Sequence, residues 1–363
     1  AALEGFNRAL HQADIVLAPA KAQQRLTETS RVLAGYIFPK GMIENRTIQK
    51  LIIIPDGLLH TIPFEVLCFK NGEQNGLQYL VEQFDISYAY SATLLCNEIE
   101  PRQTASTNCL AFAPSYDGAA NESNLALALR SFRDGEWGAL AFTEQEVKAI
   151  PSHFDGMVYT GAMASEAKFR EEAQNYGILH LAMHGLADTL NPLNSKLVFT
   201  QPKDTAEVSL DNDGFLHAYE IYNLPLQARL AVLSACETGV GELVQGEGVM
   251  SLARSFHYAG CPSVVTSLWK VDDEATAKLM GYFYKNLAEG KTKSTALREA
   301  KLSYLENASE SKKHPLYWAG FVLIGDDSEI VLPVSGNSKW LLVLGSVALL
   351  TIAILITRRK LMS

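Results

Sequence analysis

ARLAVLSACETG, residues 228–239, is the stretch of sequence around which the rest of the chain is organised. Leu230 to Leu233 is an uninterrupted apolar run, which is typical of a strand buried on both faces of a parallel sheet. Small residues follow it, and then come Cys236 and Gly239. A strand that delivers a cysteine into a glycine-containing loop is a common way to present a nucleophile. The pattern also fits a buried structural cysteine, because free cysteine is among the most buried residue types.

A second apolar stretch upstream, ILHLAMHG at residues 178–185, ends in His184 and Gly185. Two parallel strands that end in these residues and in Cys236 would bring imidazole and thiol to one edge of a sheet. A neighbouring histidine removes the thiol proton, and the thiolate is the reactive nucleophile. The interval between the two residues is 52 positions (236 − 184). Caspase-type peptidases place their histidine about 50 residues before the cysteine, although their local cysteine consensus is absent here.

Several separated motifs resemble the CHAT domain family, a group of caspase- and separase-like domains often found behind tetratricopeptide repeats. The motifs are SACETG at 234–239, the His184-Gly185 strand end, PDG at 55–57 with IPFE at 62–65, and HPLYWAGF at 314–321. The resemblance covers about residues 30 to 325. It implies an α/β fold of caspase-like type, in which a mostly parallel sheet has helices on both faces. It also implies a protein or peptide substrate.

The resemblance implies roles for three residues of a cysteine peptidase site. His184 would be the general base and Cys236 the nucleophile, while the backbone N–H groups of Gly185 and Cys236 would bind the oxyanion. Several relatives hold a basic substrate side chain in an acidic pocket. The candidates for such a pocket are Asp188, Glu237, Asp272 and Asp273. The last two also fit a helix start, where the helix dipole favours acidic residues.

Two other chemistries are weakly supported by the sequence. His180 and His184 are four residues apart and would share a face of one strand, but a zincin needs a helix and a glutamate after the first histidine. Leu181 stands there, so we expect His180 to be a core residue. The glycines between residues 239 and 248 miss the dinucleotide spacing at Val244, and no Walker lysine follows. We therefore expect no metal and no cofactor.

The composition narrows the class of protein. The net charge is −9, and no cluster of Lys and Arg occurs before residue 358, which argues against nucleic-acid binding. The five cysteines are widely spaced and include no CxxC pair, which argues against a zinc ribbon or a dense disulfide framework. The 363 residues suffice for one large α/β domain or two average domains.

The domain plan follows from local patterns. Residues 1–37 read as a helical lead-in, either the end of an upstream repeat region or the first helices of the domain itself. The peptidase domain spans 38–325, and 326–339 is a linker. Within the domain, the run Leu51 to Ile54 predicts a strand without a wet face. Residues 114–141 read as a long loop, and Thr143 with Glu146 predicts a capping box.

The segment 340–357 predicts a transmembrane helix, followed by a basic tail at 358–363. Its 18 residues carry no charge, and at 1.5 Å per residue they reach about 27 Å, which is enough to span a bilayer core. The alternative is a buried C-terminal helix. Three basic residues follow the span, against one lysine in the preceding linker. This bias places the C-terminus in the cytoplasm and the catalytic domain in the periplasm of a bacterial cell. A reactive thiol would favour the reducing side instead.

The sequence therefore predicts a membrane-anchored cysteine endopeptidase with a His-Cys dyad. An upstream sensor or repeat region would regulate it, and proteins bound by upstream tetratricopeptide repeats would be its partners. The alternative is a non-catalytic signalling scaffold with a vestigial peptidase site.

Overall fold

The computed structural model describes most of the chain up to residue 331. The described residues are 1–11, 19–39, 41–43, 47–70, 77–96, 106–116, 140, 142–188, 190–202, 208–209, 212–234, 247–269 and 271–331. All but the last of them belong to one compact unit, Ala1–Ile330.

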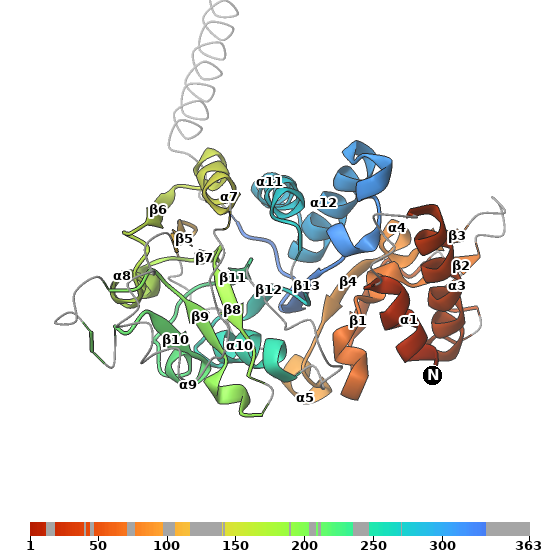
Figure 1. Ribbon diagram of the computed structural model, residues 1–363, viewed down its shortest axis with the longest axis horizontal. Helices are drawn as coiled ribbons and strands as arrows, with labels where there is room; N and C mark the ends of the chain where they lie inside the picture. Colours follow the sequence, from red (N-terminus) through yellow and green to blue (C-terminus); the bar gives the residue numbers. More distant parts are fainter. Residues whose placement is uncertain are drawn as a thin grey trace, which may run out of the picture. The chain divides into compact units, whose positions relative to one another are not determined.

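Within these residues, an eight-stranded sheet forms the centre of the unit, in the order β1-β4-β13-β12-β11-β7-β5-β6 (Figure 1). The pairs β1–β4, β11–β12, β7–β11, β5–β7 and β5–β6 are parallel, and β12–β13 is antiparallel. The prediction of a mostly parallel sheet is confirmed. The strand bounds are β1 (Lys50–Ile53), β4 (Asp85–Tyr88), β5 (Cys109–Pro114), β6 (Gly156–Gly161), β7 (Ile178–Leu181), β11 (Leu230–Leu233), β12 (Ser263–Ser267) and β13 (Phe321–Gly325).

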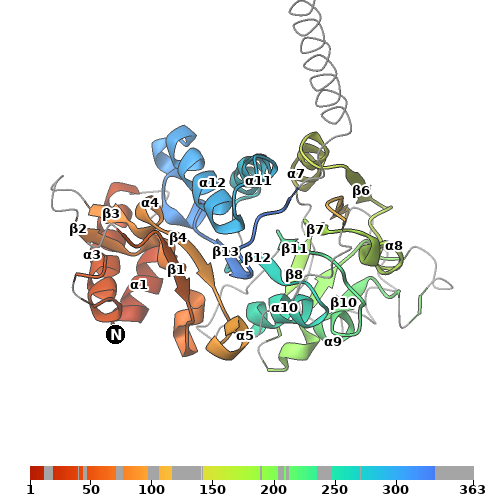
Figure 2. The ribbon, with the colours of Figure 1, turned by 180° about the vertical axis from the view of Figure 1, so that it is seen from behind.

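Helices cover both faces of this sheet, as predicted. Figures 1 and 2 show α7 (Thr143–Ala149), α11 (Asp273–Ala288) and α12 (Lys293–Asn307) on one face. On the other face lie α9 (Ala218–Ile221) and α10 (Glu247–Tyr258). The remaining helices are α1 (Ala2–Leu10), α3 (Pro19–Ile37), α4 (Leu80–Gln83), α5 (Ala92–Cys96) and α8 (Glu166–Glu172).

Two smaller sheets complete the described fold. One has the order β10-β9-β8, and the other is the antiparallel pair β2–β3. Their bounds are β2 (Cys68–Lys70), β3 (Leu77–Tyr79), β8 (His184–Leu186), β9 (Lys196–Val198) and β10 (Phe215–His217).

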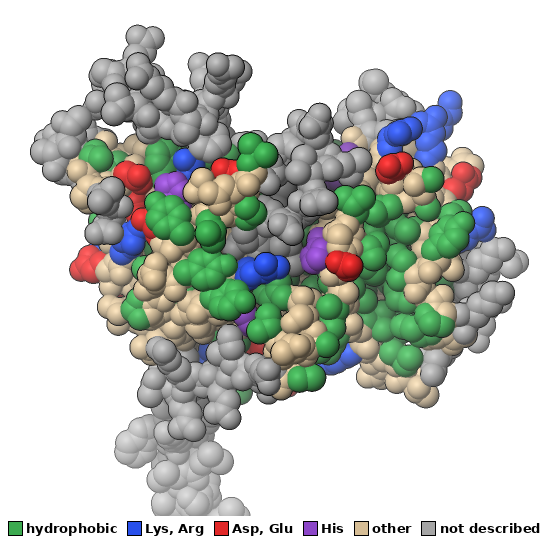
Figure 3. All heavy atoms as spheres, turned by 90° about the horizontal axis from the view of Figure 1, so that it is seen from below, with side chains coloured by type: hydrophobic (Ala, Val, Ile, Leu, Met, Phe, Trp, Pro, Cys, Tyr) green, Lys and Arg blue, Asp and Glu red, His purple; other side chains and the backbone are tan. Residues whose placement is uncertain are grey.

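The apolar runs are buried in the central strands of the sheet but partly exposed in β1 at its end. Every residue of β7 and β11 is buried, as their unbroken apolar sequences predict. The same expectation is wrong for β1, where Ile52 is 53% exposed and Ile54, just after the strand, is 44% exposed. The physical reason is position: among the described strands, β1 is the last of the sheet, so its side chains have strand neighbours on β4 alone. Figure 3 shows hydrophobic side chains gathered on the side of the unit where β1 and the N-terminal helices lie.

The N-terminal helices pack into the same compact unit as the sheet. Phe6 and Leu10 of α1 are fully buried. In α3, the Ser30 hydroxyl donates to the carbonyl of Val66 at 2.8 Å and accepts the N–H of Cys68 at 2.7 Å. The helices α1 and α3 are thus joined to the rest of the unit by buried side chains and by specific hydrogen bonds.

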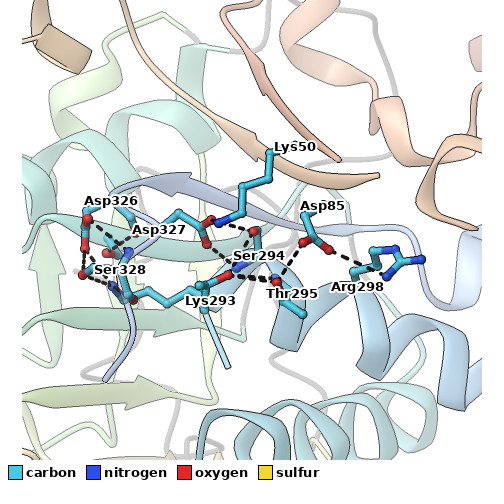
Figure 4. Close-up of polar contacts among 11 residues, drawn as sticks. Lys50, Asp85, Lys293, Ser294, Thr295, Arg298, Asp326, Asp327 and Ser328 are labelled. Atoms are coloured by element: carbon cyan, nitrogen blue, oxygen red, sulfur yellow. Dashed lines mark hydrogen bonds and ion pairs between the residues drawn. The ribbon is translucent and has the colours of Figure 1, made fainter. Parts of the chain in front are cut away.

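A polar network fixes the start of α12 (Figure 4). Lys293 is 1% exposed, and its ammonium donates to the Asp326 carboxylate at 2.8 Å and to the Ser328 carbonyl at 2.7 Å. The Asp327 carboxylate accepts the backbone N–H of Ser294 at 2.6 Å and pairs with Lys50 at 2.9 Å. An anion at a helix N-terminus satisfies unpaired N–H groups and the helix dipole. The segment after β13 therefore anchors both α12 and β1.

A second network lies deeper in the core. Lys301 of α12 and Glu65 are 1% and 2% exposed, and their charged groups are 2.7 Å apart. The Tyr88 hydroxyl donates to the other oxygen of Glu65 at 2.6 Å. Glu65 belongs to the IPFE motif, and its carboxylate is the acceptor at the centre of this buried ion pair. The pair is costly to break because the remaining charge stays buried.

The predicted membrane span lies outside the described residues. Among the helices that the structure describes, none has the combination of length and apolarity that crossing a bilayer requires.

Candidate active site

His184 lies where the chain leaves the central sheet. β7 ends at Leu181, and β8 begins at His184 in the three-stranded sheet. The histidine is opposite Val198 of β9 in the antiparallel register. Its side chain is buried, with 3% of its surface exposed. The apolar run fills the central strand up to Leu181, and Gly185 is the middle residue of β8, where it is opposite Leu197.

Tyr116 contacts this histidine from the end of β5. The backbone N–H of His184 donates to the Tyr116 hydroxyl at 3.0 Å, and that hydroxyl donates to the Val198 carbonyl at 2.9 Å. The two side-chain rings are also in contact, with centroids 4.6 Å apart and an interplanar angle of 53°. Sequence reasoning missed Tyr116, which is 68 residues away from His184 in the chain. The available signal was its position two residues after a buried strand.

The strand that leads to Cys236 is the direct neighbour of β7. Leu233 pairs with Leu181 in parallel register, and the N–H of Ser234 donates to the Leu181 carbonyl at 3.0 Å. Cys236 and Glu237 lie outside the described residues. The pairing of β7 with β11 confirms the predicted neighbourhood of the two strands.

His180 and His184 do not share a strand, contrary to expectation, because the chain changes sheets between them. His180 is fully buried, which confirms it as a core residue. Its Nδ1 is 2.8 Å from the Tyr284 hydroxyl, and its Nε2 is 3.0 Å from Glu146 Oε1, although these two atoms are not aligned as a hydrogen bond. The predicted capping box at Glu146 is therefore wrong. Phe142 is the N-cap of α7, and Glu146 faces the core.

The described carboxylates of the predicted pocket make structural contacts, and Asp272 also pairs with Lys312 at 3.2 Å. Asp188 accepts the backbone N–H groups of Leu190 and Asn191 at 2.9 and 2.8 Å. Asp272 is the N-cap of α11, where it accepts the N–H of Ala275 at 3.0 Å. Asp273 lies in the first turn of the same helix. Turn and cap roles of this kind are common for aspartate.

Lys196 is a cation near this site that the sequence reading did not identify. It begins β9, is 6% exposed, and its ammonium lies 4.3 Å from the centre of the Phe215 ring. Burial lowers the pKa of Lys196, while the charges of Asp213 and Asp188 act in the opposite direction. The buried ammonium thus gives this side of the small sheet a positive charge beside an aromatic ring.

Glu166 fixes the turn that leads into β10. Its carboxylate is fully buried and accepts the N–H groups of Asp213 and Gly214 at 3.1 and 3.0 Å. Arg170 donates to the other carboxylate oxygen at 2.8 Å. Burial raises the pKa of Glu166 to about 7, and the contact with Arg170 opposes this shift. In the described part of the chain, no three His, Cys, Asp or Glu side chains are grouped closely enough to hold a metal ion.

The HPLYWAGF motif builds structure next to β12 and β13. The indole of Trp318 is buried and donates to the Lys313 carbonyl at 3.0 Å. The indole of Trp269, just after β12, donates to the Leu316 carbonyl at 2.9 Å. At Gly320 a Cβ atom would lie 2.8 Å from Cγ2 of Val271 and 3.2 Å from the Trp269 ring. The crowding therefore favours a glycine where the backbone meets these two side chains.

His314 is the first residue of that motif, and the fold stabilises its neutral imidazole. Nδ1 accepts the N–H of Leu316 at 3.2 Å, and the side chain is 4% exposed. Burial, with a smaller contribution from the charge of His11, lowers the pKa of His314 to about 4. The unfolded chain binds a proton near pH 6.5, whereas the folded chain does not. The stability from His314 is thus complete above pH 6.5 and is lost as the pH falls towards 4.

We expect His314→Asn to reduce the loss of unfolding free energy at acid pH, because asparagine retains an acceptor for the cap but does not titrate. Urea unfolding of the full chain should show the wild type losing on the order of 2 kcal/mol more than the variant between pH 6.5 and 4. His60→Asn, at a partly exposed histidine, is the matched control and should follow the wild type. If the unfolding free energies of the wild type and His314→Asn fall by the same amount between pH 6.5 and 4, this account is contradicted.

Comparison with known proteins finds a matching family, two relatives of similar sequence and solved structures of similar fold. The CHAT domain matches residues 7–326. Tetratricopeptide repeat protein 28 of Homo sapiens is 27% identical over 313 residues, and the protein of the same name from Mus musculus is 27% identical over 315. Each alignment covers 79% of this chain but 12% of the relative, so the chain spans about an eighth of the relatives' length.

Two solved structures share parts of the fold. The Saccharomyces cerevisiae separase-securin complex matches with a TM-score of 0.43 and 15% identity, covering 75% of this chain and 15% of the matched chain. The Arg specific cysteine proteinase gingipain R of Porphyromonas gingivalis matches with a TM-score of 0.47 and 10% identity. That match covers 90% of this chain and 74% of the other.

Proposed function

This chain belongs to the CHAT domain family, and we propose that it is a cysteine endopeptidase with Cys236 as nucleophile and His184 as general base. The observation that carries the proposal is the register between two neighbouring strands. Leu181 of β7 pairs with Leu233 of β11. His184 and Cys236 each follow their paired leucine by three positions. Because neighbouring strands lie about 4.8 Å apart, the segments that carry the two residues leave β7 and β11 at adjacent points of one sheet edge, which supports a close approach of imidazole and thiol.

The proposed mechanism assigns the proton and the charge to particular groups. His184 accepts the proton of the Cys236 thiol, and the thiolate attacks the scissile carbonyl carbon. The N–H groups of Gly185 and Cys236 donate to the resulting oxyanion. The imidazolium of His184 then protonates the departing amine. Water, deprotonated by the same imidazole, hydrolyses the thioester and restores the free enzyme.

The acidic residues around the site suggest a substrate class. Asp188 follows β8 directly, and Asp272 begins α11 shortly after β12. With Asp273 and Glu237, they form the proposed pocket for a basic side chain before the scissile bond. The Oδ1 oxygen of Asp188 already accepts two backbone N–H groups. A carboxylate has about four acceptor positions, so such contacts leave room for a substrate cation.

Hydrolysis of a fluorogenic peptide library by the purified full chain tests the proposal. We expect cleavage that favours arginine or lysine before the scissile bond and that stops after alkylation of the protein. A preference for acidic residues at that position would contradict the acidic pocket and point instead to Lys196. A non-catalytic scaffold would leave the whole library uncut, even at high protein concentration.

We also propose that residues 340–357 anchor the enzyme as a single-pass helix, with the C-terminus in the cytoplasm. The support is the uncharged segment and the three basic residues after it. Protein partners would act through an upstream repeat region of the kind named in the curated relatives. Protease added to sealed spheroplasts should digest an outward-facing catalytic domain. Protection until lysis would reverse this orientation.

A further inference from the structure

We propose that Tyr116 is a positioning residue that fixes the backbone and the imidazole of His184. The inference rests on the proposed function of His184 as the base of a peptidase site. Tyr116 follows β5, which is the neighbour of β7 on the side opposite β11. The tyrosine therefore approaches His184 from one side, and β11 leads to Cys236 on the other.

The Tyr116 hydroxyl bridges the two strands at the position of the histidine. It accepts the N–H of His184 at 3.0 Å and donates to the carbonyl of Val198 at 2.9 Å. His184 and Val198 are opposite residues in the β8–β9 register. The hydroxyl therefore contacts a backbone group of each strand at this pair of residues. It thus sets where the backbone of the base lies after the chain has left the central sheet.

The ring of Tyr116 restricts the imidazole as well as the backbone. The two ring centroids are 4.6 Å apart, so the histidine side chain packs on the aromatic ring. The tyrosine is itself held by Val198 and Phe215, with Leu186 and Leu140 packed around this cluster. A side chain confined by packing around its ring and by two hydrogen bonds at its hydroxyl is a rigid support for a functional group.

A rigid support matters because proton transfer requires close and constant geometry. A displacement of about 1 Å at a catalytic group can cost about 100-fold in rate. Tyr116→Phe removes only the bridging hydroxyl and retains the ring contact, so it separates the two parts of the support. We expect kcat to fall by about 100-fold with KM nearly unchanged, because Tyr116 is placed to hold the base rather than the substrate.

The matched control is Tyr159→Phe. Tyr159 lies on the adjacent strand β6, is 6% exposed, and donates its hydroxyl to Glu172 at 3.2 Å. Its ring stacks on Phe112, at a centroid distance of 5.1 Å. The control therefore removes a hydroxyl from a similarly buried tyrosine whose hydroxyl and ring contact Glu172 and Phe112. It should retain wild-type kcat and KM.

The experiment combines peptide hydrolysis with NMR of the histidine ring in the full chain labelled with ¹³C-histidine. Tyr116→Phe should change the imidazole signals of His184 and lower kcat, while Tyr159→Phe should change neither. Unchanged His184 signals in Tyr116→Phe would overturn the positioning role, whatever the activity. An inactive wild type would refute the proposed function. In that case, altered His184 signals would still establish that Tyr116 positions this side chain.

Discussion

Cys236→Ala is expected to abolish peptide hydrolysis and labelling by a substrate-like thiol probe, while the fold is retained. Removing the nucleophile of a covalent protease costs about 10⁶-fold in kcat, which leaves only background hydrolysis. Mass spectrometry of the probe adduct and a peptide assay on the same preparation measure both losses. Far-UV circular dichroism before and after the substitution establishes that the α/β fold is intact.

The other cysteines provide the controls for this result. Cys261 is fully buried, and burial raises its pKa to about 12. At pH 7 such a thiol is ionised in roughly one molecule in 10⁵, so it is a poor nucleophile. Cys96 is exposed and will react with small alkylating agents. Cys261→Ala and Cys96→Ser should therefore retain activity, and a probe adduct on Cys261 would mean that the nucleophile is wrongly assigned.

The architecture of the site is largely predictable from the sequence, because apolar runs determine the strands that carry it. Leu230–Leu233 and Ile178–Leu181 contain only residues that favour a buried strand, with the exception of His180. Both are fully buried, adjacent and parallel. The same reasoning fails for Ile52 and the adjacent Ile54, since composition does not reveal that β1 ends the sheet.

The contacts around the two histidines were beyond sequence reasoning for a different reason. Glu146 has the spacing of a capping residue, but its side chain reaches His180 in the core. Tyr116 reaches His184 over 68 positions of the chain. Local patterns report which elements form, whereas these contacts depend on how distant elements pack. The residue roles that depend on Cys236 itself remain predictions.

The second large effect is expected for His184→Ala, which should lower kcat by about 10⁴-fold. A general base contributes about 10²- to 10⁴-fold by itself, and losing it also removes the proton donor for the leaving amine. Because the imidazole packs on Tyr116, alanine would leave a space the size of the lost ring. Added imidazole should therefore restore part of the activity of this variant. Rate measurements with and without imidazole provide the test.

His180 supplies the decisive control, because it lies on the strand that leads to His184 but faces the core. Its ring contacts Tyr284 at 2.8 Å and is fully buried. His180→Gln retains a polar group towards these partners. It should lower the unfolding temperature, while kcat of the folded protein stays close to the wild-type value. If imidazole rescues His180→Gln but not His184→Ala, the base is wrongly assigned. If both variants lose activity in proportion to their loss of folded protein, His184 has only a structural role. Rescue of His184→Ala alone, at full retention of the fold, is the outcome that a catalytic base requires.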